Sequence, residues 1–513
     1  MVTFPTPQSY TYSNFKGIRT RNGVNTGGAI SAVVCQNVDF VPNTVGSDTQ
    51  IKSTKGNVLV TQYPNYSIIK GFETVQDGQR YHLVYVENAT KGMLLRYITY
   101  DNTFEVLIDN LLVTGKANGI TMKDTAYDVF VFTNGKDYYS VNFNTTPITQ
   151  VINPVYNKKK VTGLALAEKD GSLVIGQEDG FGLVIGSRQG DIYDWNYAVT
   201  ADDKTKPWYQ LFGKGVTAIV PYIGGLLVFT ADDSTMLSGN PADLTSFERE
   251  DSSLGGCMSF ESWCKHDKYL FFYDNTQKNI YYYTQIDTGQ KILGEPIAPE
   301  VQQYFDDEVT RVQMTGFIGE NRSEIWILSN KFKLIYDYFI GEWSERVCQD
   351  INSYYVSENA VYSTTSDGKI LKEKEGAVSC VFDGVFYPAV YTMQTINLGS
   401  YSNMKEMEMQ PLFTVSDDQD NIFAIDCLID GKKTKTRRVQ VIVNGAKWDL
   451  SKFDMSKFAK GSKSVTHQLK GKFVSNWYYI QFTVRTEEKG QEFNILAMEL
   501  KGITMETDTI GKK

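Results

Sequence analysis

Histidine is scarce in this chain, and the scarcity limits the chemistry that the side chains can perform. Only three histidines occur among 513 residues, and His82, His266 and His467 are far apart in the sequence. A Ser-His-Asp array or a histidine-based metal site would have to be assembled from very few parts. G-x-S-x-G, H-E-x-x-H and P-loop patterns do not occur either. We therefore expect the histidines to be structural or surface residues.

Cysteines and clustered acidic residues give no stronger sign of a reactive or metal-binding site. The six cysteines form no C-x-x-C pair: they are Cys35, Cys257, Cys264, Cys348, Cys380 and Cys427. We expect buried free thiols in a reducing compartment. The segment DDQDN (417–421) has oxygens spaced for calcium but lacks the glycine and the final glutamate of an EF-hand, so we interpret it as a solvated turn.

Carboxylate chemistry is an alternative that the sequence leaves open. Glycoside hydrolysis needs only two carboxylates, which distant segments can supply, and the chain has 60 acidic residues. The turns SRQGDIYDW (187–195) and TTSDGKI (364–370) are similar to the Asp-box turns of sialidase-type propellers, in which such turns are structural. We predict that the chain is not an enzyme and uses no cofactor or metal. A carbohydrate-binding or glycoside-cleaving β-propeller is the alternative.

Positive charge is concentrated in one short segment of an acidic chain. The formal net charge of -9 argues against general binding of polyanions. The segment GKKTKTRR (431–438) is the densest basic stretch, with Lys432, Lys433, Lys435, Arg437 and Arg438. We interpret it as a solvated hairpin loop, with docking on an acidic partner or contact with a nucleic-acid backbone as the functional alternative.

The elements that must position these residues are predicted to be strands. Tyr (32) and Phe (28) are abundant, and aromatic and β-branched side chains fit a pleated sheet better than a helix. Helical spacing is restricted to short segments near 299–305 and 450–458. We therefore predict an all-β protein.

A hairpin pattern recurs seven times: an apolar strand, a polar turn, and a second strand that begins with aromatic residues. Its turn centres lie near residues 101, 134, 190, 233, 275, 330 and 367, about 44 residues apart on average. In VIGSRQGDIYDWN (184–196), the second strand is expected to start at Ile192 and Tyr193. This spacing predicts a degenerate six- or seven-bladed β-propeller over residues 56–388, against the alternative of a β-sandwich series with coincidental spacing.

The two ends of the chain differ from the repeat. Residues 389–505 contain longer strands with clear alternation, which predicts a C-terminal β-sandwich-like docking domain. Residues 1–55 are expected to form an extended N-terminal docking arm, and residues 506–513 a tail. The N-terminus lacks the basic and apolar regions of a signal peptide, and nowhere do 18 apolar residues run together, so we expect no export by an ordinary signal and no membrane insertion.

Short motifs along most of the chain resemble one family of viral proteins. FKGIRTR (15–21), ISAVVCQNVDF (30–40) and IKSTKGN (51–57) resemble the opening of phage tail proteins with a "G-I/L-N-T-R" start, an "A-x-N-V-D-F" core and a following "R-x-G", which here is Thr54-Lys55-Gly56. Similar propeller and C-terminal motifs are GLVIGSRQGDIYDWN (182–196), MLSGNPADLTSFERE (236–250), SLGGC (253–257), LIYDYFIGEWSER (334–346), VQVIVNG (439–445) and YYIQFTVRTEEKGQEFNILAMELKGI (478–503).

This resemblance implies a tail hub or nozzle protein of the packaged-DNA stabilisation type from short-tailed bacteriophages. Such a protein is a subunit of a six-fold homo-oligomeric ring below the portal and adaptor. It extends the exit channel for double-stranded DNA without sequence recognition, and it contacts distal fibre, needle or nozzle proteins. The implied location is the virion tail, after assembly in the host cytoplasm. We expect the basic segment and Asn37, Asp39 and Phe40 of the second motif to contribute to its interfaces.

Overall fold

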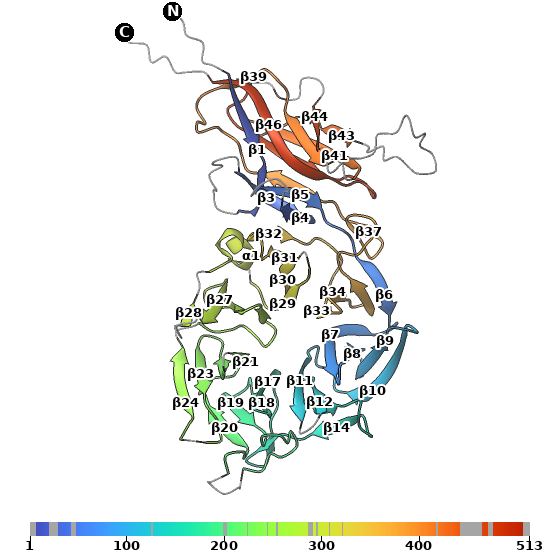
Figure 1. Cartoon of the computed structure of the whole chain (residues 1–513), viewed down its shortest axis with the longest axis vertical. Helices are drawn as coiled ribbons and strands as arrows, with labels where there is room; N and C mark the ends of the chain where they lie inside the picture. The colour runs from blue at the N-terminus through green and yellow to red at the C-terminus, as the bar shows by residue number, and fades with distance from the viewer. Residues whose placement is uncertain are drawn as a thin grey trace, which may run out of the picture. The chain divides into compact units, whose positions relative to one another are not determined.

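The chain folds into two compact units, each assembled from β-strands (Figure 1). The propeller unit comprises Leu59–Lys333 and Asp350–Glu373, and the terminal unit comprises Met1–Val58, Leu334–Gln349 and Lys374–Lys513. The computed structural model describes residues 7–19, 29–42, 48–124, 127–197, 203–222, 224–243, 245–252, 255–285, 291–293, 296–306, 308–320, 322–416, 419–434, 436–441, 464–469, 474 and 476–505.

The propeller unit contains six separate four-stranded antiparallel sheets, each forming one blade (Figure 1). The first two blades consist of β7 (Ser67–Gln76), β8 (Gln79–Glu87), β9 (Gly92–Ile98) and β10 (Thr103–Leu111), and of β11 (Asn118–Asp124), β12 (Tyr127–Thr133), β13 (Tyr138–Val141) and β14 (Thr149–Ile152). The third and fourth consist of β17 (Ala165–Lys169), β18 (Ser172–Gly176), β19 (Leu183–Gly186) and β20 (Trp208–Leu211), and of β21 (Ala218–Tyr222), β22 (Gly225–Phe229), β23 (Ser234–Ser238) and β24 (Glu248–Ser252). A two-stranded hairpin of β15 (Val155–Tyr156) and β16 (Lys159–Lys160) connects the second and third blades.

The fifth and sixth blades complete the set. The fifth consists of β25 (Trp263–His266), β26 (Tyr269–Asp274), β27 (Asn279–Gln285) and β28 (Lys291–Leu293), and the sixth of β33 (Ser353–Ser357), β34 (Ala360–Thr364), β35 (Lys369–Lys372) and β6 (Val58–Gln62). Between them in sequence, β29 (Val312–Ile318) and β30 (Ser323–Ser329) form a hairpin, and β29 contacts both β25 and β33. The predicted all-β propeller is confirmed.

The sixth blade is closed by an early strand. β6 is the outer strand of a sheet whose other three strands follow residue 350, and Figure 1 shows blue β6 beside the late strands. The chain therefore joins the ring of blades by pairing segments about 300 residues apart, since β35 begins at Lys369. Such closure leaves only short strand edges exposed.

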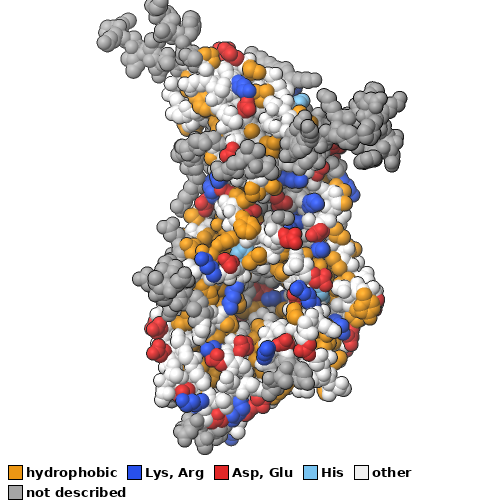
Figure 2. Space-filling model, viewed as in Figure 1, with side chains coloured by type: hydrophobic (Ala, Val, Ile, Leu, Met, Phe, Trp, Pro, Cys, Tyr) orange, Lys and Arg blue, Asp and Glu red, His pale blue; other side chains and the backbone are white. Residues whose placement is uncertain are grey.

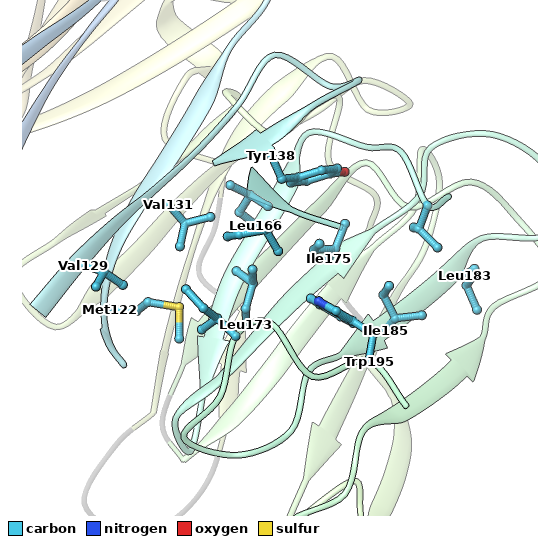
Figure 3. Packing of buried hydrophobic residues seen from close by; sticks show 13 residues of the cluster. Met122, Val129, Val131, Tyr138, Leu166, Leu173, Ile175, Leu183, Ile185 and Trp195 are labelled. Atoms are coloured by element: carbon cyan, nitrogen blue, oxygen red, sulfur yellow. The ribbon is translucent and has the colours of Figure 1, made fainter. Parts of the chain in front are cut away.

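Apolar side chains of neighbouring blades interlock to form the core of the propeller unit. Between the second and third blades, Val131 and Tyr138 lie in one cluster with Leu166 and Ile175 (Figure 3). All four are at most 3% exposed. The nearly continuous apolar character of strands such as β12 follows from this, because both of their faces contact a neighbouring blade.

The third blade differs from the hairpin predicted there. No strand begins at Ile192 and Tyr193, and the next strand of the sheet is β20. Ile192 and Trp195 instead turn into the apolar cluster, at 0% and 5% exposure. The Arg188 guanidinium fixes this loop by bonding Asp194 and Asp203, so side-chain packing and an ion pair replace a strand ladder.

The terminal unit contains strands from both ends of the chain. One sheet has the order β4 (Val38–Pro42), β5 (Thr49–Ser53), β46 (Asn494–Met505), β40 (Leu412–Ser416) and β44 (Ser464–Gln468), with β1 (Gln8–Tyr12) and β39 (Lys405–Met407) also paired to β46. A second run has the order β31 (Lys333–Asp337), β32 (Glu342–Glu345), β3 (Ala29–Gln36), β38 (Val390–Met393), β45 (Ile480–Arg485), β41 (Asn421–Ile429) and β42 (Lys432–Lys433). β2 (Asn14–Ile18) pairs with β3, and β43 (Arg437–Val441) with β41, while β36 (Val381–Phe382) and β37 (Val385–Phe386) form a small hairpin.

The described residues of 1–55 therefore contribute strands to sheets, in contrast to the extended arm expected from their glycines. Alternation interrupted by one register shift explains this: in β3, Ile30, Ala32 and Cys35 are fully buried, and the shift between Ala32 and Val34 keeps Cys35 on the buried face. The short helical segment expected near 299–305 is present as η1 (Pro299–Val301) and α1 (Gln302–Asp306). The segment 450–458, the tail 506–513, and Asp417 and Asp418 of the acidic turn lie outside the described residues.

Candidate functional site

The three interface residues predicted from the second motif lie within the terminal unit. Asn37 and Phe40 are 1% and 7% exposed. The Asn37 amide donates to the carbonyls of Val347 (2.9 Å) and Pro388 (3.2 Å), and its Oδ1 accepts from the Val347 N–H (3.0 Å). Asn37 also has φ 53°, a left-handed conformation that asparagine tolerates better than most residues. Its side chain therefore joins segments distant in sequence.

Asp39, whose side chain is 26% exposed, belongs to a partly buried ionic cluster with two cations. Lys374 Nζ lies 2.6 Å from Asp39 Oδ1, and the Lys374 side chain is 6% exposed. Burial alone would raise the pKa of Asp39, but the Lys374 ammonium, assisted by Arg346, outweighs burial and holds this pKa below its ordinary value. Arg346 is itself 2% exposed, donates to Thr54 Oγ1 (3.1 Å) and lies 4.0 Å from the centroid of the Phe382 ring. Asp39 is thus held as a carboxylate.

A second carboxylate, Glu342, is buried and joins the first motif to the GEWSER segment, most of which forms β32. Its Oε2 accepts from the Gly17 N–H at 2.7 Å and from Arg19 Nη2 at 3.0 Å, and Lys16 Nζ lies 3.3 Å from Oε1. The Glu342 side chain is only 2% exposed. Removal of this carboxylate would leave the guanidinium and the backbone N–H without their acceptor, which is costly at a buried site.

Two motif glycines are required by close backbone approaches in the same unit. A Cβ on Gly17 would lie 2.4 Å from the Trp343 carbonyl oxygen, and one on Gly56 would lie 1.9 Å from that of Val381. Neither approach leaves room for a side chain. The motifs at 15–21, 30–40 and 51–57 therefore converge with 341–346 in two polar groups, one around Glu342 and one around Asp39 and Arg346. We call these groups together the motif network: Gly17, Arg19, Asn37, Asp39, Thr54, Gly56, Glu342, Arg346 and Lys374.

The basic segment forms a hairpin edge of the terminal unit, and much of its charge is neutralised there. Lys433 Nζ and Arg485 Nε lie 2.9 and 3.0 Å from Asp426 Oδ2. Burial alone would raise the pKa of Asp426, but Arg485, the Thr436 hydroxyl and Lys433 together lower it to about 2. The site is thus a mixed-charge surface.

Other members of the basic segment differ in exposure. Arg438 is 74% exposed at its side chain and bonds Glu487 Oε2 at 2.8 Å, and Lys432 is exposed. Arg437 is half-buried, and Lys435 lies outside the described residues. The structure brings Lys432, Lys433, Arg437 and Arg438 together on β42 and β43, whereas Asn37 and Asp39 belong to the motif network and Phe40 is a buried apolar residue of β4.

One histidine does meet a serine and carboxylates, in the propeller unit. His82 Nε2 lies 2.7 Å from Ser357 Oγ, and the Ser357 hydroxyl donates to Glu73 Oε2 at 2.5 Å. Since that hydroxyl proton is used, Nε2 must carry the proton that Ser357 Oγ accepts. Glu358 also approaches Nε2, at 3.6 Å, while Nδ1 is buried with no partner among the described residues. A catalytic array needs the carboxylate on Nδ1, so this group instead joins the first and sixth blades.

The remaining polar groups of the propeller unit also act between or within blades. The Glu261 carboxylate lies 3.0 Å from Lys70 Nζ and 3.1 Å from Arg311 Nε. Burial alone would raise the pKa of Glu261, but these two cations lower it. Figure 2 shows acidic and basic side chains interspersed over the visible face.

All six cysteines are buried and free, as expected from their spacing. Burial raises the pKa values of the Cys257, Cys264 and Cys427 thiols to about 12, which disfavours the reactive thiolate. Within the part of the chain that the structure describes, three or more potential ligands among His, Cys, Asp and Glu never gather closely enough to hold a metal ion. Among the same residues, no helix has the length and apolar character to cross a membrane.

Comparison with known proteins shows likeness of fold only. Neither a protein-family model nor a curated protein matches the chain. Among solved structures, BBS1N in complex with ARL6DN, soaked with mercury, is 13% identical with a TM-score of 0.39, covering 64% of this chain and 98% of that one. The extracellular domain of the putative hybrid two-component system BT4673 from B. thetaiotaomicron is 10% identical with a TM-score of 0.41, covering 65% and 42%. The AfRom2 CNH domain is 11% identical with a TM-score of 0.38, covering 62% and 98%. The strands and blades described above therefore define the class, an all-β protein built on a propeller.

Sequence reasoning missed the partners that complete these sites. Glu342 and Arg346 occur in the quoted GEWSER motif, but nothing in the motif indicates that they are buried or that they contact residues 17–54. Asp426 and Glu487 lie outside the basic segment, on or just after neighbouring strands. One signal for the Asp426 ion pair was available in the segment NIFAIDCLI (421–429). A single carboxylate in an otherwise apolar strand, next to a basic hairpin, indicates an ion pair.

Proposed function

We propose that this chain is a non-enzymatic structural subunit of a phage tail ring, a hub or nozzle that extends the DNA exit channel below the portal and adaptor. The observation that carries the proposal is the motif network. The short motifs that resemble tail proteins lie far apart in sequence, yet their charged and glycine residues contact one another in one unit. Convergence of this kind supports the view that the motifs specify one shared scaffold.

The fold suits a load-bearing subunit. A propeller is a rigid block with short strand edges, so it can sit in a closed ring with little tendency to polymerise through exposed strands. Heterologous contacts between identical subunits close into a ring when the rotation per subunit permits. The acidic chain, at a net charge of -9, also suits a conduit that must release DNA, because cations lining a channel would hold phosphates through counterion release.

Within this proposal, the mixed-charge edge formed by β42 and β43, which both pair with β41, contacts an acidic neighbour. Its exposed cations are Lys432, Lys433 and Arg438, of which Lys433 is paired with Asp426 and Arg438 with Glu487. Rim charges of this type affect association rate and salt dependence more than affinity. Ring assembly should therefore slow as ionic strength rises.

The test is electron microscopy and native mass determination of the purified chain, alone and with a portal–adaptor complex from its own particle. We expect a ring, six-fold by the resemblance, with an axial opening of about 20 Å or more, wide enough for a DNA duplex. Lys432→Glu with Arg438→Glu should slow its formation, whereas Lys489→Glu, an exposed residue of the same unit, should not. A chain that stays monomeric alone and also fails to join the portal–adaptor complex would overturn the proposal.

A further inference from the structure

An open cleft of the propeller unit lies where the first and sixth blades meet. Its volume is about 770 Å³, within the range of small-molecule sites. Its walls come from the segment joining β6 to β7, the turn joining β8 to β9, and the turn joining β34 to β35. The lining residues are Gln62, Pro64, Asn65, Tyr66, Ser67, Ile69, Glu87, Asn88, Ala89, Ser366 and Asp367.

One wall of the cleft is aromatic and is held from behind. The Tyr66 ring lies 5.2 Å from that of Tyr63, which in turn lies 5.2 Å from Phe104. Pro64 and Ile69 extend the apolar surface. A ring supported in this way is pre-organised, so a flat apolar face of a bound molecule can stack on it without ordering a mobile side chain.

The other groups in the cleft are amides, hydroxyls and carboxylates. Asn65 is exposed and makes no hydrogen bond within the described part of the chain. Asn88 uses its Oδ1 to accept from the Thr90 and Lys91 N–H groups, which fixes the amide so that Nδ2 is available to donate. Asp367 is 54% exposed. These groups are the donors and acceptors that recognise hydroxyls.

The charge of the cleft restricts what it can bind. None of the lining residues is Lys, Arg or His, and two are carboxylates, Glu87 and Asp367. A phosphate, a nucleic acid or an acidic sugar would meet these carboxylates, and the adjacent cation Lys369 is already paired with Asp367 at 2.7 Å. An apolar ligand would leave the amides unpaired. Stacking together with hydroxyl recognition, without positive charge, is the chemistry of a neutral sugar.

We propose that this cleft is a binding site for a neutral oligosaccharide, with one sugar ring stacked on Tyr66 and its hydroxyls bonded by Asn65, Asn88 and Asp367. This goes beyond the structural role above and would give the subunit a direct contact with a glycan. Cleavage is not part of the proposal. Glu87 already accepts from the Tyr85 hydroxyl and from the N–H groups of Thr114 and Gly115, and Asp367 is ion-paired with Lys369, so neither is poised as a general acid.

The experiment is titration calorimetry of the full chain with maltohexaose, cellohexaose and hexa-N-acetylchitohexaose as neutral probes and oligogalacturonate as the acidic comparator. At least one neutral probe should saturate one site per chain, and oligogalacturonate should bind more weakly. Tyr66→Ala should weaken binding roughly tenfold, in line with loss of one aromatic anchor. Ala89→Trp, which adds bulk at an exposed lining position and removes no contact, should abolish binding.

Tyr100→Ala is the matched control, because Tyr100 is 87% exposed on the same blade and does not line the cleft. It should bind as the wild type does. Thermal melting of each variant separates loss of binding from loss of fold, and Ala89→Trp keeps the test decisive if Tyr66→Ala melts early. The proposal is overturned if no neutral probe saturates, if oligogalacturonate binds more tightly, if Ala89→Trp binds normally, or if new reducing ends appear. Each result is independent of ring formation.

Discussion

Replacement of Asp426 by asparagine tests whether the basic segment is neutralised from within the terminal unit. Asp426 is 7% exposed and lies against Lys433, Arg485 and Thr436, and its pKa is lowered from 3.8 to about 2. At about 1.4 kcal/mol per tenfold change in proton affinity, this lowering of the pKa corresponds to a contribution of at most about 2.5 kcal/mol to the free energy of unfolding. Lys433 is 56% exposed, so screening by water reduces the expected loss to about 1–2 kcal/mol.

The sign of the pH dependence follows from the lowered pKa. A carboxylate whose folded pKa lies below its unfolded pKa stabilises the fold above the unfolded value, and this stabilisation is lost as pH falls through the folded value. Asp426→Asn should therefore raise hydrogen–deuterium exchange of β41 and β45 roughly 5- to 30-fold at pH 7. The ratio of variant to wild-type rates should fall below about pH 4 and approach one near pH 2.

Comparison of the two proteins at the same pH cancels the intrinsic pH dependence of exchange. Glu406→Gln is the control, because Glu406 is an exposed carboxylate of the same unit with no ion pair among the described residues, and its ratio should stay near one throughout. Two results would refute the reasoning: a ratio near one at pH 7, or an elevated ratio that does not change between pH 7 and pH 2.5.

Three further predictions test the scaffold. Glu342→Ala should lower the free energy of unfolding of the terminal unit by about 3–5 kcal/mol, and Glu342→Gln should lower it by less, because both variants leave buried donors without a carboxylate. Denaturant unfolding measures both effects. Equal, small effects of the two variants would contradict the buried cluster. Deletion of residues 1–66, which removes β6, should lower the melting temperature and cause aggregation through the exposed edge of β35, visible by size exclusion. Burial lowers the pKa of His82, so the imidazole binds a proton more readily in the unfolded chain than in the folded one. Stability should therefore fall as pH drops below about 6.5. His82→Gln should reduce the difference between the melting temperatures at pH 7.5 and pH 5.5.

The blades could be predicted from the sequence because their signals are local. An apolar run followed by a polar turn is typical of a hairpin, and repetition at a blade-sized interval indicates a propeller. The third blade departs from the prediction because the outcome there depends on a contact that no local pattern records. Arg188 bonds Asp203, fifteen residues later in the chain. This contact holds a loop at the place where the aromatic residues after the turn had predicted a second strand.

The assembly of the terminal unit could not be predicted by the same means. Its strands come from residues 8–53, 333–345 and 390–505, and pairings such as β3 with β38 depend on which apolar faces fit together after the chain has folded back. The glycines of residues 17–46 favoured an arm, since glycine is usually a mark of loops. In the structure, Gly17 is instead needed because the Trp343 backbone approaches it too closely for a side chain.

The motif network and the cleft answer different physical requirements. The network is largely buried and combines ion pairs with close backbone approaches, so most substitutions there are expected to cost stability. The cleft is open, and its polar groups Asn65 and Asp367 are exposed, so the same substitutions there should cost little stability and affect only binding. If the chain is a tail subunit, the network should therefore determine whether it folds and assembles, while the cleft should determine which glycan it meets. Variants that separate these two effects would distinguish a scaffold that carries a glycan site from a glycan-binding protein that merely shares the scaffold.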